Sequence, residues 1–150
     1  MQKIMVGLLF SCIVSHSYGQ LQEIETSGWT DVGHLKRLGT TIAKMSFKAS
    51  GSDTSYHLLM KDFTKQQEVN YFSVSFSNVD NTFGRLYDLL KSFFLSENKQ
   101  KNYTRAFKLG AEGVHLQHTA VIGSKAVRLT TNDGYINLSE KDIDKVFGKR

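Results

Sequence analysis

Histidine and serine are the residues in this chain best suited to chemistry, because an imidazole can bind metal or move a proton and a hydroxyl can act as a nucleophile. His115 and His118 lie three residues apart. The segment around them alternates apolar and polar residues like a strand, and residues three apart on a strand point to opposite faces. The two histidines should therefore not share one metal ion. We predict no metal site and no cofactor.

Three serines, Ser73, Ser75 and Ser77, occupy every second position of an alternating segment. A serine nucleophile needs a positioned base and often lies in a Gly-x-Ser-x-Gly or Ser-x-x-Lys motif. The chain has no such elbow, and no Ser-x-x-Lys precedes an apolar helix. We assign no catalytic residue and interpret the serines as the polar side of a half-buried strand, a surface that can also hold a ligand.

The acidic residues fit structural positions. Glu140, Asp142 and Asp144 lie in the first turns of an expected helix, where the helix dipole favours negative charge. The glycine-containing segment 110–113 lacks the Lys-Ser/Thr of a phosphate-binding loop and leads into a strand. These patterns predict no catalytic carboxylate pair. A small hydrolase-type enzyme with a motif-less site stays open as an alternative.

Alternating apolar and polar residues predict two sets of strands, each followed by a helix. The chain is expected to be structured from Trp29 on, with Trp29, Val32, Leu35 and Leu38 among the buried residues. Clear strands are expected at residues 40–49, 56–61, 69–77, 103–109, 114–122, 125–131 and 135–137. Gly123-Ser124 suits a two-residue hairpin turn.

The first helix is expected within residues 78–96, where apolar residues recur at steps of three and four. Asp80, Asn81 or Thr82 can cap it. The second helix should begin after Ser139, which with Asp142 resembles a capping box. The plan reads as ββββα twice. We predict an α+β fold: an antiparallel sheet from two ββββα-like halves, with both helices packed on one face.

Composition is that of an ordinary globular chain. The 150 residues carry a formal charge of +5, and 40% of them are hydrophobic, which is enough for one domain with a sizeable core. The charges are interspersed, without the block of like charges that indicates a nucleic-acid-binding arm. We therefore expect residues 29–150 to form a single domain with most Lys and Arg exposed to solvent.

Residues 1–19 are typical of an export signal. Lys3 supplies the positive start, residues 4–14 the apolar stretch, and Ser17-Tyr18-Gly19 a small-x-small cleavage site. Residues 20–28 then form a polar, flexible lead-in. The apolar stretch is too short for a transmembrane span of ~20 residues, and no later stretch approaches that length.

Cys12 is the only cysteine, and it lies inside this signal. Cleavage would leave a chain without thiol or disulfide chemistry, which fits a bacterial envelope protein, periplasmic or secreted. Residues 9–12 also resemble a lipoprotein box, which would make Cys12 a lipid anchor. The bulky Phe10 departs from that pattern, so we favour ordinary cleavage and keep the lipoprotein as the alternative.

The repeated ββββα plan is similar to that of PUR-type and PC4-like single-strand nucleic-acid binders. This resemblance implies a basic and aromatic sheet surface, for which Tyr71, Tyr103, Arg105, Lys125 and Arg128 are the candidates here. The similarity is one of topology, and fold does not determine function. Export also removes a protein from cellular nucleic acid, so we do not expect nucleic acid as a partner.

Export together with the missing catalytic motifs favours a non-enzymatic binding module for a protein, peptide or small ligand. We expect both helices to cover one side of the sheet, so a ligand would bind the other side. The candidate ligand-binding residues on that side are Lys44, Lys48, Tyr71, Ser73 and Ser75, with Ser46 beside them.

Overall fold

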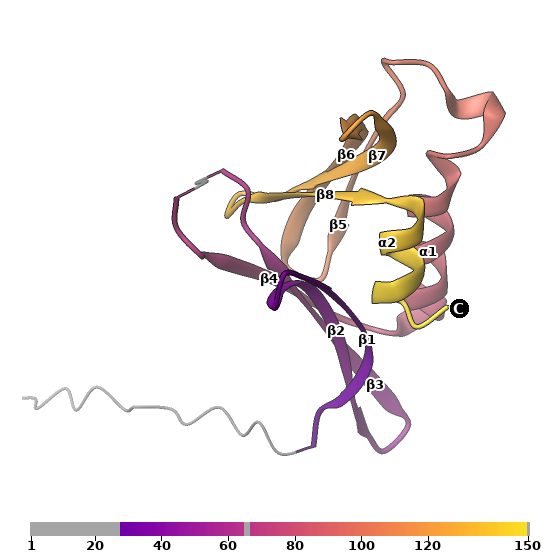
Figure 1. The fold of residues 1–150 in the computed structure, drawn as a ribbon. Helices are drawn as coiled ribbons and strands as arrows, with labels where there is room; N and C mark the ends of the chain where they lie inside the picture. Colours follow the sequence, from indigo (N-terminus) through magenta and orange to yellow (C-terminus); the bar gives the residue numbers. More distant parts are fainter. Residues whose placement is uncertain (1–27, 65–66, 150) are drawn as a thin grey trace, which may run out of the picture.

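The computed structural model of the chain describes residues 28–64 and 67–149 (Figure 1). The predicted signal peptide, Cys12 and the lead-in up to residue 27 lie outside the described residues. Eight strands form two four-stranded antiparallel sheets, and one helix follows each sheet in the chain. The predicted α+β class with antiparallel strands is confirmed, and each ββββα half forms a sheet of its own.

Strands follow one another in space as they do in the chain. The first sheet, sheet A, contains β1 (Thr30–Arg37), β2 (Thr40–Ser50), β3 (Asp53–Lys61) and β4 (Tyr71–Ser77). The second, sheet B, contains β5 (Thr104–Leu109), β6 (Glu112–Val121), β7 (Ser124–Thr130) and β8 (Tyr135–Ser139). Helix α1 (Thr82–Ser92) lies between the short 3-10 turns η1 (Val79–Asn81) and η2 (Ser96–Asn98), and α2 (Glu140–Val146) follows β8.

Both helices lie on the same side of the molecule (Figure 1), and the buried face of each sheet is turned toward them. In sheet A the buried rows are Ala43–Met60–Phe72, Met45–Leu58–Val74 and Phe47–Tyr56–Phe76. In sheet B they include Leu116–Leu129–Ile136 and His118–Val127–Leu138. The buried residues of both sheets and both helices form one hydrophobic cluster.

The two sheets meet at the end of β3. The backbone N–H of Phe63 donates to the Tyr135 carbonyl at 3.0 Å. The Asp62 carboxylate, 6% exposed, accepts from the Tyr135 N–H at 3.3 Å and from the Thr64 N–H at 2.9 Å. A buried carboxylate is costly unless it accepts hydrogen bonds, so this group ties the β3–β4 connection to the start of β8.

A side-chain network joins the two helices. The Tyr87 hydroxyl donates to Asp144 Oδ1 at 2.9 Å, and Lys91 Nζ donates to both carboxylate oxygens of Asp144 at 2.9 and 3.2 Å. Lys91 also pairs with Glu140 at 2.8 Å. Burial acts to raise the pKa of Asp144, but the bonds from Lys91 and Tyr87 outweigh it and lower the pKa below the usual 3.8.

Helix caps are partly as expected. The capping box of Ser139 and Asp142 is present, and Arg37 Nη2 adds an ion pair to Asp142 Oδ2 at 2.7 Å. At α1 the prediction is wrong: Asn81 occupies the cap position in a left-handed conformation without a side-chain bond. Asn78 Oδ1 instead accepts the Phe83 N–H at 3.0 Å. The 3-10 turn before α1 brings this earlier side chain into reach.

Two hairpin turns lie at positions that differ from the sequence-based prediction, and each exposes an apolar residue. Leu38, expected to be buried, is fully exposed, because Leu38-Gly39 is the two-residue turn between β1 and β2. The β6–β7 turn is Ile122-Gly123, one residue earlier than predicted, since Val121 pairs with Ser124. All four turn residues have positive φ, as a type I′ hairpin turn requires. None of the helices in residues 28–64 and 67–149 is long and apolar enough to cross a membrane.

Replacing Phe93 by Ala should lower the free energy of unfolding by roughly 3–5 kcal/mol, because the ring is 1% exposed and joins α1 to sheet B. Denaturant unfolding measures this loss. Leu95→Ala is the matched control. Leu95 lies two residues beyond Phe93 but is 49% exposed, so its loss should cost well under about 1 kcal/mol. Equal losses in the two variants would show that Phe93 does not join α1 to the core.

Asp144→Asn should lower the free energy of unfolding by about 0.5–1 kcal/mol at pH 7, since the carboxylate is one-third exposed and its bonds are partly screened. The pKa of Asp144 is lowered in the folded state, so its contribution is present above the unfolded value near 3.8 and is lost as pH falls through the lower folded value. Urea unfolding should therefore show a difference between variant and wild type at pH 7 that shrinks near pH ~2. A difference that is constant with pH would contradict this account.

Candidate functional site

The side of sheet A turned away from the helices, which we call the outer face, contains every ligand-binding residue predicted from the sequence. Successive side chains on a strand alternate between faces, so residues between the buried rows point outward. The outward rows are Lys44–Leu59–Ser73, Ser46–His57–Ser75, Lys48–Ser55–Ser77 and Lys61–Tyr71. The structure thus brings Lys44, Lys48, Tyr71, Ser73 and Ser75 together on one surface.

An imidazole lies at the middle of the outer face. His57 Nδ1 is 3.0 Å from Ser75 Oγ, and the Trp29 ring packs edge-on against the imidazole with 5.8 Å between ring centroids. Burial lowers the pKa of His57 from its usual 6.5, because desolvation disfavours the charged ring. His57 therefore presents a neutral, aromatic surface at neutral pH.

Basic side chains lie on either side of this imidazole. Lys44 Nζ pairs with Asp31 Oδ1 at 2.8 Å, and Ser46 Oγ donates to the same carboxylate oxygen at 3.3 Å. The bond from Lys44 is the main reason that the pKa of Asp31 is lowered. Lys48 lies against the chain before β1, since a Cβ added at Gly28 would meet Lys48 Cε at 3.5 Å.

Tyr71 closes the other end of the outer face. Its ring is attached to the edge strand β4, and its hydroxyl donates to the Thr41 carbonyl on β2 at 3.1 Å. The side chain therefore reaches across β3. It remains 42% exposed, which leaves much of the ring available to a ligand. A tyrosine fixed in this way offers contact area at little further cost in side-chain entropy.

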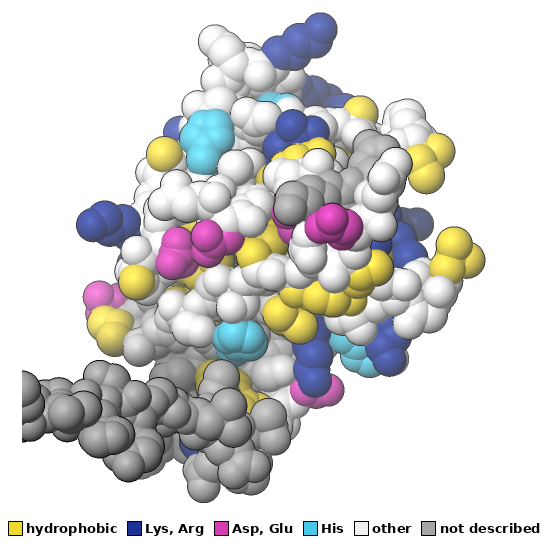
Figure 2. All heavy atoms as spheres, turned by 90° about the vertical axis from the view of Figure 1, so that its left-hand side faces the viewer, with side chains coloured by type: hydrophobic (Ala, Val, Ile, Leu, Met, Phe, Trp, Pro, Cys, Tyr) yellow, Lys and Arg dark blue, Asp and Glu magenta, His cyan; other side chains and the backbone are white. Residues whose placement is uncertain are grey.

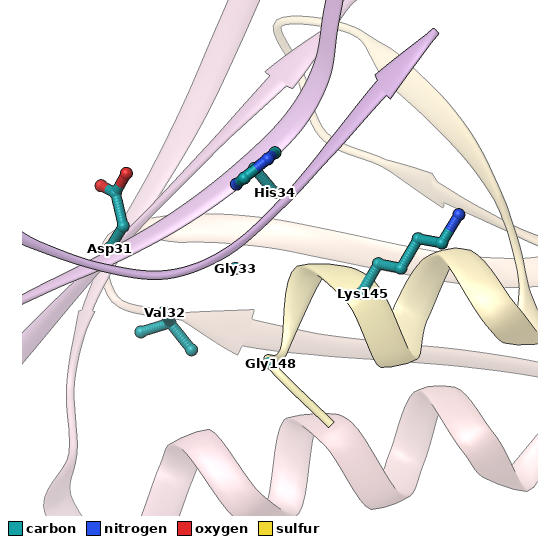
Figure 3. Close-up of a pocket in the computed structure, with 6 residues that line it drawn as sticks. All are labelled: Asp31, Val32, Gly33, His34, Lys145 and Gly148. Carbon is teal, nitrogen blue, oxygen red and sulfur yellow. The ribbon is translucent and has the colours of Figure 1, made fainter. Parts of the chain in front are cut away.

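Figure 2 shows the molecule from the side opposite the helices, where histidine, charged and hydrophobic side chains are interspersed. A hollow of about 580 Å³ lies at the edge strand β1, where α2 ends (Figure 3). Gly33 faces the last carbonyls of α2 there, and an added Cβ would lie 2.1 Å from the Lys145 oxygen. The side chain of Lys145 extends away from those of Asp31 and His34 (Figure 3), so the polar groups do not converge on one ligand.

The histidine pair considered for metal binding is divided between two faces of sheet B. His118 points inward, where it packs against Phe93 and its Nε2 lies 2.6 Å from the Asn98 carbonyl oxygen. His115 points outward and is exposed. Within residues 28–64 and 67–149, no group of three or more His, Cys, Asp or Glu side chains is arranged to hold a metal ion.

The residues considered for single-strand nucleic-acid binding do not gather on one surface. Tyr71 lies on the outer face of sheet A, whereas Arg105 stacks over Tyr103 at 4.5 Å near the free edge of sheet B. Arg128 lies on the outward side of sheet B, stacked over Tyr135 at 4.4 Å and bonded to Asn137. The stacking platform implied by the PUR-type resemblance is therefore not assembled from these side chains.

The fold is of the α+β class with two antiparallel meanders, and the candidate site lies on the helix-free face of sheet A. Comparison with protein-family models, curated proteins and solved structures finds no match for the chain. The contribution of His57 and Trp29 was missed at the level of sequence. The sequence does contain a signal for His57, because Tyr56, Leu58 and Met60 alternate along the strand as apolar residues, so His57 between them must point to the other face.

Trp29→Ala should raise the pKa of His57 toward its usual 6.5, because the indole is one of the groups that bury the imidazole. A pH titration of the His57 ring signals by NMR measures the change. Tyr71→Ala is the matched control: it removes another ring of the outer face, two outward rows away from His57, and should leave the pKa of His57 unchanged. An unshifted value in Trp29→Ala would show that other groups bury the ring.

Proposed function

We propose that this protein is an exported, non-enzymatic binding module of the bacterial envelope, periplasmic or secreted, and that its outer face holds an acidic protein or peptide segment. The observation that carries the proposal is the convergence of the predicted residues on one helix-free face. The core does not need this face, because the helices cover the opposite side of sheet A. A surface without a packing role is where a ligand can bind without disturbing the fold.

Charge supports an acidic partner. Lys44, Lys48 and Lys61 point outward from β2 and β3, and Asp31 is the carboxylate that pairs with one of them. The excess of cations would attract carboxylates and orient their approach. Trp29, His57 and Tyr71 add rigid rings, the kind of side chain that supplies much of the binding energy at interfaces.

A serine hydrolase is the second candidate, because Ser75 Oγ and His57 Nδ1 are within hydrogen-bond distance and the lowered pKa keeps His57 neutral and able to accept a proton. A nucleophile of this kind also needs a group that orients the base. The Trp29 ring packs against the imidazole, and an indole ring does not orient a base as a carboxylate does, which favours binding over catalysis.

Lys48→Ala and Tyr71→Ala should each weaken binding of a hexaglutamate peptide by about three- to tenfold, because each removes a contact at the edge of the surface. NMR titration at ~50 mM salt, with amide shifts followed residue by residue, measures the affinity and its location. Shifts are expected on β2, β3 and β4 around Lys48, His57 and Tyr71.

The matched control is Lys125→Ala, which removes an exposed lysine on β7 of the other sheet and should leave the affinity unchanged. Shifts spread evenly over all lysines, or equal affinity in Lys48→Ala and wild type, would overturn the placement of the ligand. Covalent labelling of Ser75 by a fluorophosphonate would instead favour the hydrolase.

A further inference from the structure

Strand β5 is an edge strand that the rest of the described chain leaves open. It pairs with β6 on one side in an unbroken register from Thr104–Gln117 to Leu109–Glu112. No backbone hydrogen bond from outside this hairpin reaches Thr104–Leu109 within the described residues. An open, regular edge presents a row of unpaired N–H and C=O groups, which is a template for another strand.

The other three edge strands are blunted. β1 carries two register shifts and packs at Gly33 against the end of α2. At β4 the turn after β5 lies so close that a Cβ on Gly110 would be 2.0 Å from the Ser75 carbonyl oxygen. β8 is joined to the β3–β4 connection through the Phe63–Tyr135 hydrogen bond. Of the four edge strands, β5 is therefore the one best able to pair with a further strand.

A groove of about 520 Å³ runs along this open edge, between β5 and helix α1. Three consecutive residues of β5, Phe107, Lys108 and Leu109, line it. Because successive side chains point to opposite faces, three in a row can border one groove only if the backbone edge itself faces it. Helix α1 contributes the opposite wall, with Arg85 and Asp88 at the rim and Leu89 deeper down.

We propose that β5 and α1 form a receptor for an extended acidic peptide segment of a partner protein, which adds to sheet B as a further strand. Backbone pairing with β5 would supply binding energy, and the groove would take every second side chain of the peptide. This site is on the other sheet from the outer face of the proposed function and does not depend on it.

The charges beside β5 favour an acidic peptide as the ligand. Arg85 and Lys108 line the groove, Arg105 lies further along the same strand, and Asp88 carries the one carboxylate among the described lining residues. An acidic residue in the peptide would meet an excess of cations there. A second copy of this chain fits less well. A second copy would bring Arg105 and Lys108 of both β5 strands to one seam, and β5 itself contains no acidic residue to balance them.

The test is selection of a random heptapeptide display library on the purified protein, followed by titration of synthetic copies of the enriched peptides. Enriched peptides should contain an acidic residue among alternating β-branched or aromatic ones. Arg85→Glu and Lys108→Glu should each weaken their binding by at least about tenfold. Both positions are exposed, and a carboxylate in the first turns of α1 is compatible with the helix dipole, so both variants should fold as judged by circular dichroism.

Lys125→Glu, the same charge reversal on β7, is the matched control and should leave the affinity within about twofold of wild type. Hydrogen exchange gives the second readout: bound peptide should slow exchange of amides in Thr104–Leu109 by at least about tenfold. Lys48→Ala and Tyr71→Ala should have no effect, which separates this site from the outer face of sheet A. Failure to enrich any peptide, affinity unchanged in Arg85→Glu, or protection of β5 that arises from self-association with rising concentration would each overturn the proposal.

Discussion

Helix α1 carries an aromatic ring at each end, and each ring joins it to a different sheet. Phe83 in the first turn stacks on Tyr56 of sheet A at 4.5 Å and packs against Phe147, just after α2, at 5.1 Å. Phe93 after the last turn contacts Tyr103, just before sheet B, at 4.8 Å. The ten-residue separation spans about 15 Å of helix. This bridge determines which face of each sheet is buried, because both inner faces must meet the same helix.

Because the inner faces of both sheets are buried against the helices, only part of the surface remains for a ligand. The inner faces are filled by buried side chains, so a binding surface has to come from the outer faces, the sheet edges or the rims of the helices. The edges differ. β1 has two register shifts and the end of α2 beside it, the β5–β6 turn lies against β4, and β8 is hydrogen-bonded to the β3–β4 connection, whereas no backbone hydrogen bond from elsewhere in the described residues reaches β5. Soluble proteins usually block the exposed edges of their sheets. An edge strand that is left open is therefore a candidate for a functional role.

The strands were largely predictable, since each sheet has one buried face and a period of two is then imposed on every strand. The five candidate residues on the outer face followed from the same alternation. Turn geometry was not predictable in this way. Leu38 and Ile122 are apolar residues that hydropathy assigns to the core, yet each occupies a left-handed turn position beside a glycine. The cap of α1 was missed because the chain inserts a 3-10 turn, which moves the capping role to Asn78.

The His57–Trp29 contact and the groove between α1 and β5 depend on residues far apart in the chain, and only the packing of whole elements brings them together. The two surfaces also work by different physics. Lysines on the outer face act through charge, which at physiological salt is screened over about 8 Å. The edge strand β5 acts through backbone hydrogen bonds, which are short-ranged and insensitive to salt. Any extended peptide can form these bonds, so the charges at the rim of the groove then select among peptides. A protein with both surfaces could hold a partner by its backbone at β5 and recognise a different acidic segment at sheet A.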